Sequence, residues 1–567
     1  MKWIKREPIK KPNKNDSLLK QLADIRGITN IKDWMNPSED FWINPYDLEN
    51  IDEACERITK AIHLKEKITI MADVDADGIF SCAIMYNYIK NVIDDEEKIS
   101  YIHAQRSSGH GLETVMDEEE SEEDGLIIPI PKDTDLLIIV DSSSNSSDDC
   151  KAIKEEYGLD IIIIDHHEID NENEHALIVN CQLGHYPNMY LSGSAMCLKV
   201  CYVLDDYLGI EEAENYFDMA SIGLISDLMD ISIDENRYII NKGLRQIKNQ
   251  GLLALLTKNK VNLYHGLSVS DISYKVAPVV NACTRYDKIE LALELFTSED
   301  EDALNKLARD MIKINDKRKE EESEIVIQAM KIINNDHKVA VLIDNEIGSG
   351  FRGLIATQIA NKFDKPTFVL KYNAKTKEYH GSARSVKSID LKNLVEITGD
   401  FLYAQGHSKA FGIGIKEENF EQALQTLDEL LSDESNEEFT IYDLELIAND
   451  IDEDLIKEAE KFNRITGMGC PKAIFKIDGL VAEEREMLGK KKKETVKITC
   501  DNDLFLMKFK VNEEYALDIE EELNDDENFL VELEVVGELN LNEWYNFGKK
   551  EVVKSNQIFI TDYKIVK

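Results

Sequence analysis

Between residues 67 and 165, short apolar segments rich in β-branched residues alternate with helical patterns. The apolar segments are KITIMADVDADG, DLLIIVDSSS and LDIIIIDHHEID, and each ends in a carboxylate. Short runs of this kind between polar turns are typical of buried parallel strands. The segments between them, IFSCAIMYNYIKNVI and DDCKAIKEEYG, have helical spacing. The alternation predicts an α/β fold with a doubly wound parallel sheet.

The rest of the chain predicts further units. A helical apolar pattern from Phe217 is broken at Asp227, and residues 286–335 read as charged amphipathic helices. A second α/β unit extends from HKVAVLIDN to GIGIKEE, followed by an acidic, helical stretch over 417–465. From 472 onward, alternating segments predict a small β-barrel. The predicted domains are an N-terminal extension (1–50), the first α/β domain (51–250), a helical connector (251–335), the second α/β domain (336–435), and an acidic helical linker with the barrel (436–567).

Charge alone argues against nucleic acid as a partner. The 567 residues include 66 Lys and Arg against 111 Asp and Glu, a formal charge of −45, which repels polyanions at long range. The charge is uneven, however: residues 350–412 carry ten Lys and Arg against five Asp and Glu, a local balance of +5, and residues 1–20 have the same balance. The acidity therefore excludes a uniformly basic DNA-binding protein, but not a local nucleic-acid site.

Two further observations concern location and cysteine chemistry. No apolar run approaches the roughly 18 residues of a membrane span, and the start, MKWIKREPIKKPNK, lacks the apolar core of a secretory signal. We therefore expect no membrane association and a cytoplasmic location. The nine cysteines are scattered without a Cys-x-x-Cys pair, so neither a disulfide framework nor a cysteine zinc site is indicated.

Carboxylates follow the predicted strands and should meet at one edge of the sheet. Ligands of doubly wound sheets bind beyond the carboxyl ends of the strands, which predicts an acidic crevice there. Its members are Asp73, Asp75, Asp77, Asp141, Asp165 and, from the segment after Phe217, Asp227. Crowded carboxylates repel each other unless a cation neutralises them. With His166 and His167 adjoining, the donor set suits Mn²⁺ or Mg²⁺, and the imidazoles favour manganese.

Each residue also has an ordinary explanation. A single Asp after a strand is more often a helix N-cap or a solvated loop residue, and a lone Asp-His-His is a weak signal. The occurrence of such residues at three successive strand ends in one β-α-β order favours the metal site.

These residues resemble the motifs of the DHH phosphoesterase superfamily. The matching segments are Asp73-Val-Asp-Ala-Asp-Gly78, Asp141, Asp165-His166-His167 and the Asp227 segment. Further segments are similar to the RecJ branch of single-strand-specific exonucleases: Arg106-Ser-Ser-Gly-His-Gly111, Pro278-Val-Val-Asn281-Ala282-Cys-Thr-Arg285, Gly381-Ser382-Ala383-Arg384-Ser385 and Gln405-Gly406-His407-Ser-Lys-Ala410-Phe-Gly412. The segments GELNLNEWYNFG and QIFITDY resemble the OB-fold of RecJ proteins. The resemblance covers about residues 65–567, with family residues replaced at His110, Ser142, Ser143, Thr284 and Gln405.

The resemblance implies hydrolysis of phosphodiester bonds at a centre of two Mn²⁺ or Mg²⁺ ions. It implies metal ligands at Asp75, Asp77, Asp141, His166 and Asp227, with Asp165 bridging or supporting them. His167 is either a ligand or a phosphate donor, and Asp73 either binds metal or orients a water. Implied substrate contacts are Arg106, Asn281, Arg285, Ser382, Arg384 and His407, the last beside the scissile phosphate. Arg106, Ser382 and Arg384 would hold a 5′ end and give 5′→3′ polarity.

The implied substrate is single-stranded DNA, gripped partly by the OB-fold, in recombination, repair or replication, with replication or repair proteins as candidate partners. Lys490 to Lys493 either track the DNA backbone or form an ordinary exposed hairpin. Two alternatives stay open: a phosphodiesterase of short oligonucleotides or cyclic dinucleotides, and a non-enzymatic, replication-associated scaffold that binds nucleic acid.

Overall fold

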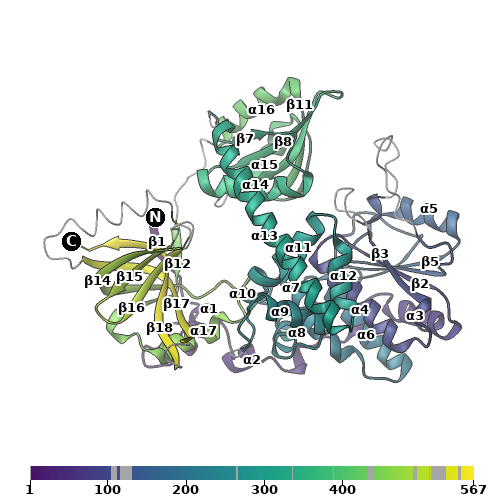
Figure 1. Ribbon diagram of the computed structural model, residues 1–567, viewed down its shortest axis with the longest axis horizontal. Coiled ribbons are helices and arrows are strands. Elements are labelled where there is room, and N and C mark those ends of the chain that lie inside the picture. The colour runs from purple at the N-terminus through teal and green to yellow at the C-terminus, as the bar shows by residue number, and fades with distance from the viewer. Residues whose placement is uncertain are drawn as a thin grey trace.

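The computed structural model describes residues 2–103, 111–114, 130–263, 266–334, 336–386, 389–431, 439–489, 495–509, 511, 531–546 and 551–566. Two of the predictions, Arg106 and Lys490 to Lys493, lie outside the described residues. Three bodies carry the described elements, each built around its own sheet (Figure 1).

The first body is built on a parallel five-stranded sheet in the order β3-β2-β4-β5-β6. Its strands are β2 (Ile68–Ala72), β3 (Ile99–His103), β4 (Leu136–Val140), β5 (Asp160–Asp165) and β6 (Leu177–Asn180). From β2 the chain goes to β3 on one side and then to β4 on the other, which makes the ends of β2 and β4 a topological switch point. The predicted doubly wound sheet is confirmed.

Helices pack on this sheet and continue its core. They are α3 (Ile51–Leu64), α4 (Ala76–Val92), α5 (Ser147–Tyr157), α6 (Gly193–Leu208), α7 (Phe217–Ser226), α8 (Asp234–Arg245), α9 (Gln250–Lys258), α10 (Val269–Asp271), α11 (Ala277–Arg285), α12 (Ile289–Thr297) and α13 (Glu301–Ile332). One cluster of buried apolar side chains extends from Leu48 to Met311 and also includes Ile465 and Cys470. Helix α7 ends where the sequence pattern predicted a break, with Asp227 as its C-cap.

Helix α13 has 32 residues, about 48 Å at 1.5 Å per residue, and leads from the first body to the second (Figure 1). Its first half packs in the core of the first body through Leu304 and Met311. Its last turns pack through Val326 and Ala329 with α14 of the second body. Of the described helices in the predicted connector over 251–335, α13 alone extends from one body to the other, because α9, α11 and α12 pack in the core of the first body.

The second body has a mixed five-stranded sheet in the order β10-β11-β9-β8-β7, antiparallel except for β7 and β8. Its elements are β7 (Ala340–Ile343), α14 (Ser349–Phe363), β8 (Thr367–Asn373), β9 (Glu378–Arg384), α15 (Leu391–Thr398), β10 (Phe401–His407), β11 (Ala410–Lys416) and α16 (Glu417–Leu430). Helix α14 packs on one face of this sheet, while α15 and α16 cover the other through a separate core.

The third body is a β-barrel, as predicted. Its strands are β13 (Leu444–Ile447), β14 (Phe475–Leu488), β15 (Thr495–Cys500), β16 (Leu504–Phe509), β17 (Val531–Asn546) and β18 (Glu551–Ile565). The order β14-β15-β16-β18-β17 closes because β17 also pairs with β14. Strand β15 alternates buried and half-exposed side chains, the pattern of a strand with one face in the barrel core.

The N-terminal extension joins the barrel to the first body. Strand β1 (Lys2–Lys5) pairs in parallel with β12 (Phe439–Tyr442), and helices α1 (Leu18–Arg26) and α17 (Glu453–Asn463) pack in the barrel core. Helix α2 (Ile31–Met35) meets the first body through Arg237, which is 1% exposed. The Arg237 side chain, from α8 of the first body, donates to the carbonyls of Trp34 (2.6 Å) and Ile465 (3.0 Å). It thereby links the first body to the N-terminal extension and to the segment between α17 and the barrel.

One expectation was wrong in detail. The stretch over 417–465 is not helical throughout, because β12 and β13 occupy 439–447 between α16 and α17. Each of these strands has four residues, too few to show periodicity, and each is fixed by pairing with a distant strand, β1 or β14. The nine cysteines are free and buried. Among the described helices, none is both long and apolar enough to cross a membrane.

Candidate metal centre

The structure brings the strand-end carboxylates and both histidines together at the switch point. Asp73 follows β2, Asp75 and Asp77 begin α4, Asp141 follows β4, Asp165 ends β5 ahead of His166 and His167, and Asp227 ends α7. Three overlapping groups have ligand atoms within 4.8 Å of one another: Asp141, Asp165, His166 and His167; Asp77, His166 and Asp227; and Asp73, Asp75 and Asp141. The crevice predicted from the sequence therefore exists as a single cluster.

The turn after β2 is held tightly against the start of α4. The Asp75 side chain caps the helix by accepting from the Gly78 N–H at 3.1 Å. A Cβ at Gly78 would lie 2.7 Å from the Cβ of Asp73, so this position requires glycine. Asp73 in turn accepts from the Gly111 N–H at 2.9 Å. The turn thus has a fixed backbone from which its carboxylates project.

Asp77 is bound to the N-terminus of α6. Its two oxygens accept from the backbone N–H groups of Gly193 at 2.7 Å and Ser194 at 3.2 Å. Helix N-termini favour negative charge because their first N–H groups are unpaired and the helix dipole is positive there. A Cβ at Gly223 in α7 would lie 1.9 Å from Asp77 Oδ1, so α7 packs directly against this carboxylate.

Asp141 is a buried carboxylate held in an unusual backbone conformation. It is 2% exposed, its backbone has a left-handed φ of 65°, and its Oδ1 is buried without a hydrogen bond. Burial and the neighbouring Asp77, Asp75 and Asp73 raise its pKa well above the ordinary value. A Cβ at Gly193 would lie 2.2 Å from Asp141 Oδ1, so the carboxylate fills space that only glycine leaves.

His166 lies between two carboxylates. Its Nε2 is 3.2 Å from Asp141 Oδ1 and 3.5 Å from Asp227 Oδ2. Burial lowers the pKa of His166, which favours the neutral imidazole that can bind a metal. Burial and repulsion from Asp77 raise the pKa of Asp227 to about 8.

Asp165 differs from the other carboxylates because donors surround it. It accepts from the backbone N–H groups of His166 (2.7 Å) and Ser144 (3.2 Å) and bonds to His167 Nδ1 (2.8 Å). Burial would raise the pKa of Asp165, but the His167 hydrogen bond and both imidazoles outweigh it and hold that pKa well below the usual range. The same bond raises the pKa of His167 to about 9. Asp165 is thus ionised and orients the half-exposed His167.

The cluster fits divalent cations by three independent features. A buried carboxylate oxygen of Asp141 makes no hydrogen bond, burial and like-charged neighbours raise the pKa values of Asp141 and Asp227, and glycines shape the space around them. Oxygen donors with one or two imidazoles match the preferences of Mn²⁺ and Mg²⁺. Such ions would remove the repulsion that the carboxylates otherwise suffer.

The predicted substrate contacts lie on two bodies. Asn281 is next to the metal cluster, because its Oδ1 accepts from the Ala76 N–H at 3.1 Å. Arg285, from the same helix α11, donates to the carbonyl of Gly350 in α14 and so joins the first body to the second. Ser382, Arg384 and His407 are together on the second sheet, since β11 pairs Gly412 with Ser382 and Ala410 with both Arg384 and His407.

Sequence reasoning missed several residues that build the site. Gly193 and Gly223 make room for the carboxylates, and Ser144 holds Asp165. Asn180 donates to the His167 carbonyl at 3.0 Å, and Gln182 to the His166 carbonyl at 3.2 Å. The Ser192-Gly193-Ser194 sequence at a helix start is a signal for an anion-binding N-terminus that could have indicated Gly193.

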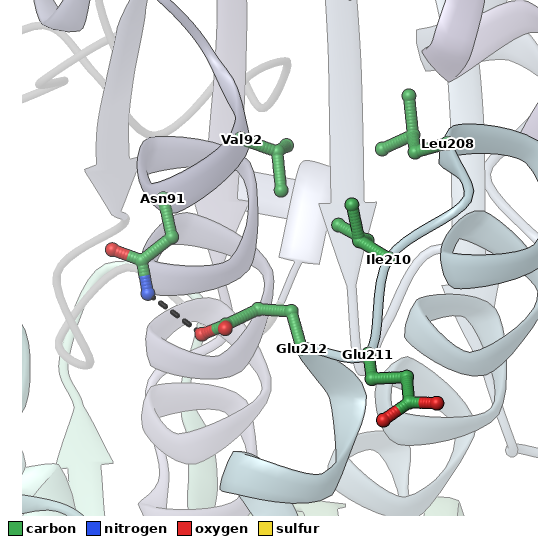
Figure 2. A pocket seen from close by; sticks show the side chains of 6 residues that line it. All are labelled: Asn91, Val92, Leu208, Ile210, Glu211 and Glu212. Carbon is green, nitrogen blue, oxygen red and sulfur yellow. Dashed lines mark hydrogen bonds between the residues drawn. The ribbon is translucent and has the colours of Figure 1, made fainter.

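A surface hollow of about 410 Å³ lies away from this cluster, at the C-terminal ends of α4 and α6 (Figure 2). It is lined by Asn91, Val92, Leu208, Ile210, Glu211 and Glu212. The metal cluster is at the opposite ends of the same helices, about 25 Å away for the 17 residues of α4. Asn91 donates to Glu212 at 2.8 Å across the hollow. The residues that line the hollow are not members of the metal cluster.

Three family models match the chain in sequence order. The DHH family N-terminal domain matches residues 67–225, the DHHA1 domain residues 336–433, and the RecJ OB domain residues 442–553. The matches coincide with the three sheets described above.

Curated relatives match nearly the whole chain. A putative prophage-derived single-strand DNA-specific exonuclease, YorK of Bacillus subtilis, is 29% identical over 98% of this chain and 97% of its own length. The single-stranded-DNA-specific exonuclease RecJ of the same organism is 27% identical over 91% of this chain and 64% of its own length.

Among solved structures, RecJ of Thermus thermophilus in complex with Mn²⁺ matches with a TM-score of 0.74 at 19% identity, over 97% of this chain and 76% of that one. At this identity the match supports the fold. The chain thus carries matches to the DHH, DHHA1 and RecJ OB domains in this order and is RecJ-like.

Proposed function

We propose that this protein is a Mn²⁺- or Mg²⁺-dependent exonuclease that hydrolyses single-stranded DNA in the 5′→3′ direction. The observation that carries the proposal is the buried cluster of carboxylates and imidazoles at the switch point of a chain with RecJ-like domain order. Its named relatives are single-stranded-DNA-specific exonucleases, and RecJ has been solved with either cation.

The residues of the cluster divide into ligands and supports. Asp75, Asp77, Asp141, His166 and Asp227 are the proposed ligands, and Asp73 is a further candidate. Two bound cations would supply charge stabilisation and an activated water for phosphodiester hydrolysis. Asp165 holds His167 by the 2.8 Å bond, which leaves the imidazolium able to donate towards a phosphate. No covalent protein nucleophile is required.

Substrate selection involves the other two bodies. Arg384, Ser382 and His407 share one region of the second sheet and would contact phosphates, and Arg106 would complete a pocket for the 5′ end. The barrel matches the RecJ OB domain, a fold that binds single strands by stacking bases on aromatic side chains beside a basic groove. Replication or repair proteins are candidate partners, and a cytoplasmic location follows from such a role.

The test is manganese-dependent digestion of a long single strand whose ends are blocked separately by phosphorothioate linkages. We expect mononucleotides from the strand blocked at the 3′ end, none from the strand blocked at the 5′ end, and little digestion of duplex. Asp165→Ala should abolish the reaction. Faster turnover of dinucleotides than of long strands would support the short-oligonucleotide phosphodiesterase instead, and tight DNA binding without turnover would support a scaffold.

A further inference from the structure

One face of the second sheet has a floor of small residues between two rows of polar side chains. On the central strand β11, Ala410, Gly412 and Gly414 point the same way, because alternate residues of a strand share a face. They pair with Arg384, Ser382 and His380 of β9 on one side. On the other side they pair with His407, Gln405 and Tyr403 of β10. The floor has no side chain larger than a methyl group, and the Tyr403 ring covers its Gly414 end, where an added Cβ would lie 2.4 Å from Tyr403 Cε1.

Helix α14 borders this face and brings a second arginine to it. A Cβ at Gly353 would lie 2.4 Å from Arg384 Nη2, so the Arg384 guanidinium rests on the first turns of α14. Arg352 precedes that glycine and lies three and four residues before Ile355 and Ala356, which are buried against this sheet, so it shares the sheet-facing side of α14. The guanidinium groups of Arg352 in α14 and Arg384 in β9 therefore both lie near the start of α14, at the border of this face.

In the described part of the chain, neither guanidinium has a carboxylate partner, although Arg384 Nη1 donates to the carbonyl of Ala383 at 2.8 Å. Arg352 Nε is buried without a hydrogen bond, and burial lowers the pKa of both Arg352 and Arg384. Among the described residues, no carboxylate forms an ion pair with either guanidinium, although the chain has 111 acidic residues. A partly buried cation without a counter-charge is costly, so a structural role does not explain the pair. A bound anion would supply the counter-charge that both guanidinium groups lack.

Helix α14 adds to the positive potential. Its first turn has no acidic residue and its N-cap, Gly348, offers no side chain to the free N–H groups. The surrounding segment 350–412 has a balance of +5 in a chain of −45. The favoured anion is a phosphate, because a planar guanidinium can donate two parallel hydrogen bonds to two phosphate oxygens.

We propose that Arg352 is a further phosphate-binding residue, which together with Arg384 grips one phosphate of a single-stranded nucleic acid lying across the small-residue floor of β11. The inference rests on the proposed function and adds to it a contact that none of the sequence motifs contains. It assigns to α14 a part in holding the strand near its cleaved end.

The experiment measures binding of a 5′-phosphorylated single strand by fluorescence anisotropy over a series of salt concentrations, in an Asp165→Ala background that prevents digestion. Arg352→Ala should weaken binding about tenfold at low salt and reduce the slope of log K against log[salt] by about 0.7, the value for one lost phosphate contact in single strands. Arg352→Lys should keep the slope. Lys362→Ala, which removes an exposed cation from the last turn of the same helix, is the matched control and should bind as the parent does.

Stability separates a binding role from a structural one. Because Arg352 is partly buried and unpaired, Arg352→Ala should melt at the same temperature as the parent or higher while binding DNA less tightly. If Arg352→Ala melts lower, Arg352→Gln is the deciding variant, because it keeps the length and a donor but not the charge. A reduced slope of log K against log[salt] in Arg352→Gln would support phosphate binding, and an unchanged slope would contradict it.

An unchanged affinity and slope in Arg352→Ala, or an equal loss in Lys362→Ala, would overturn the inference. Failure of the proposed function has a different signature. In that case the wild-type protein would not digest a long single strand, whatever residue 352 is and whether or not the strand is bound.

Discussion

Replacing Gly193 by alanine should disable the metal centre with a single methyl group. The added Cβ would lie 2.2 Å from Asp141 Oδ1 and 2.7 Å from its Cγ, whereas ordinary contacts begin at 3.4 Å. The Asp141 carboxylate must therefore move by about 1 Å. It is 2% exposed and has left-handed backbone geometry, so it has little freedom to adjust except away from the cluster.

The expected magnitude follows from that displacement. A shift of about 1 Å in a catalytic group costs on the order of 10²-fold in rate, or about 2.7 kcal/mol of transition-state stabilisation. Metal affinity should fall by roughly 10- to 100-fold, as for other disturbances of ligand position. Folding should be little affected, because alanine gains up to about 1 kcal/mol over glycine in a helix and thereby offsets part of the crowding, which costs about 1–3 kcal/mol.

The assay combines Mn²⁺ titration by electron paramagnetic resonance with exonuclease rates and thermal melting. We expect Gly193→Ala to melt close to wild type without metal but to gain much less stability on adding Mn²⁺. Gly348→Ala is the control, because nothing lies within 4 Å of its added Cβ, and it should leave Mn²⁺ affinity unchanged. Wild-type Mn²⁺ affinity and turnover in Gly193→Ala would refute the assignment of Asp141 as a ligand.

Three further outcomes are expected. Metal-free protein should lose stability as pH rises from about 4 to about 8. The pKa of Asp227 is about 8 in the folded state and about 4 in the unfolded state. Between these values the folded state binds more protons than the unfolded state, so raising the pH favours unfolding. Melting temperatures in chelator would show this decline. Mn²⁺ binding at pH 7 should release protons, since Asp227 must ionise to bind, which calorimetry in buffers of different ionisation heat detects. Arg237→Ala should lower the free energy of unfolding by about 3 kcal/mol in urea titrations, because the carbonyls of Trp34 and Ile465 lose their buried donor.

Matched variants sharpen these outcomes. Asp227→Asn should flatten the pH decline, and a decline that persists in full would assign it to other groups. Proton uptake on Mn²⁺ binding would contradict the protonated state of the free cluster. Arg309→Ala, at an exposed position of α13, should change stability by less than about 0.5 kcal/mol. An equal loss in this variant would show that the effect of Arg237→Ala is not specific.

Strand-end chemistry could be predicted from the sequence, whereas the packing around it could not. Parallel strands bring their carboxyl ends to one edge, so Asp141 and Asp165 follow from the apolar runs that precede them. The Ser192-Gly193-Ser194 sequence could indicate an anion-binding helix start, but the contact of Gly193 with Asp77, 116 residues away, could not be predicted. Arg352 lies in an ordinary helical pattern, SGFRGLIATQIA, and only its missing partner distinguishes it from a surface arginine.

The pairing of β1 with β12 has a consequence for biosynthesis. Lys2 pairs with Phe439, so β1 emerges from the ribosome 437 residues before the strand it needs. At about 5–20 residues per second, the wait is roughly 20 to 90 s. During that time the basic start of the chain has no docking surface, while the first two sheets can already form. The barrel side of the molecule is therefore expected to assemble late, and β1 should pair only after β12 has been made.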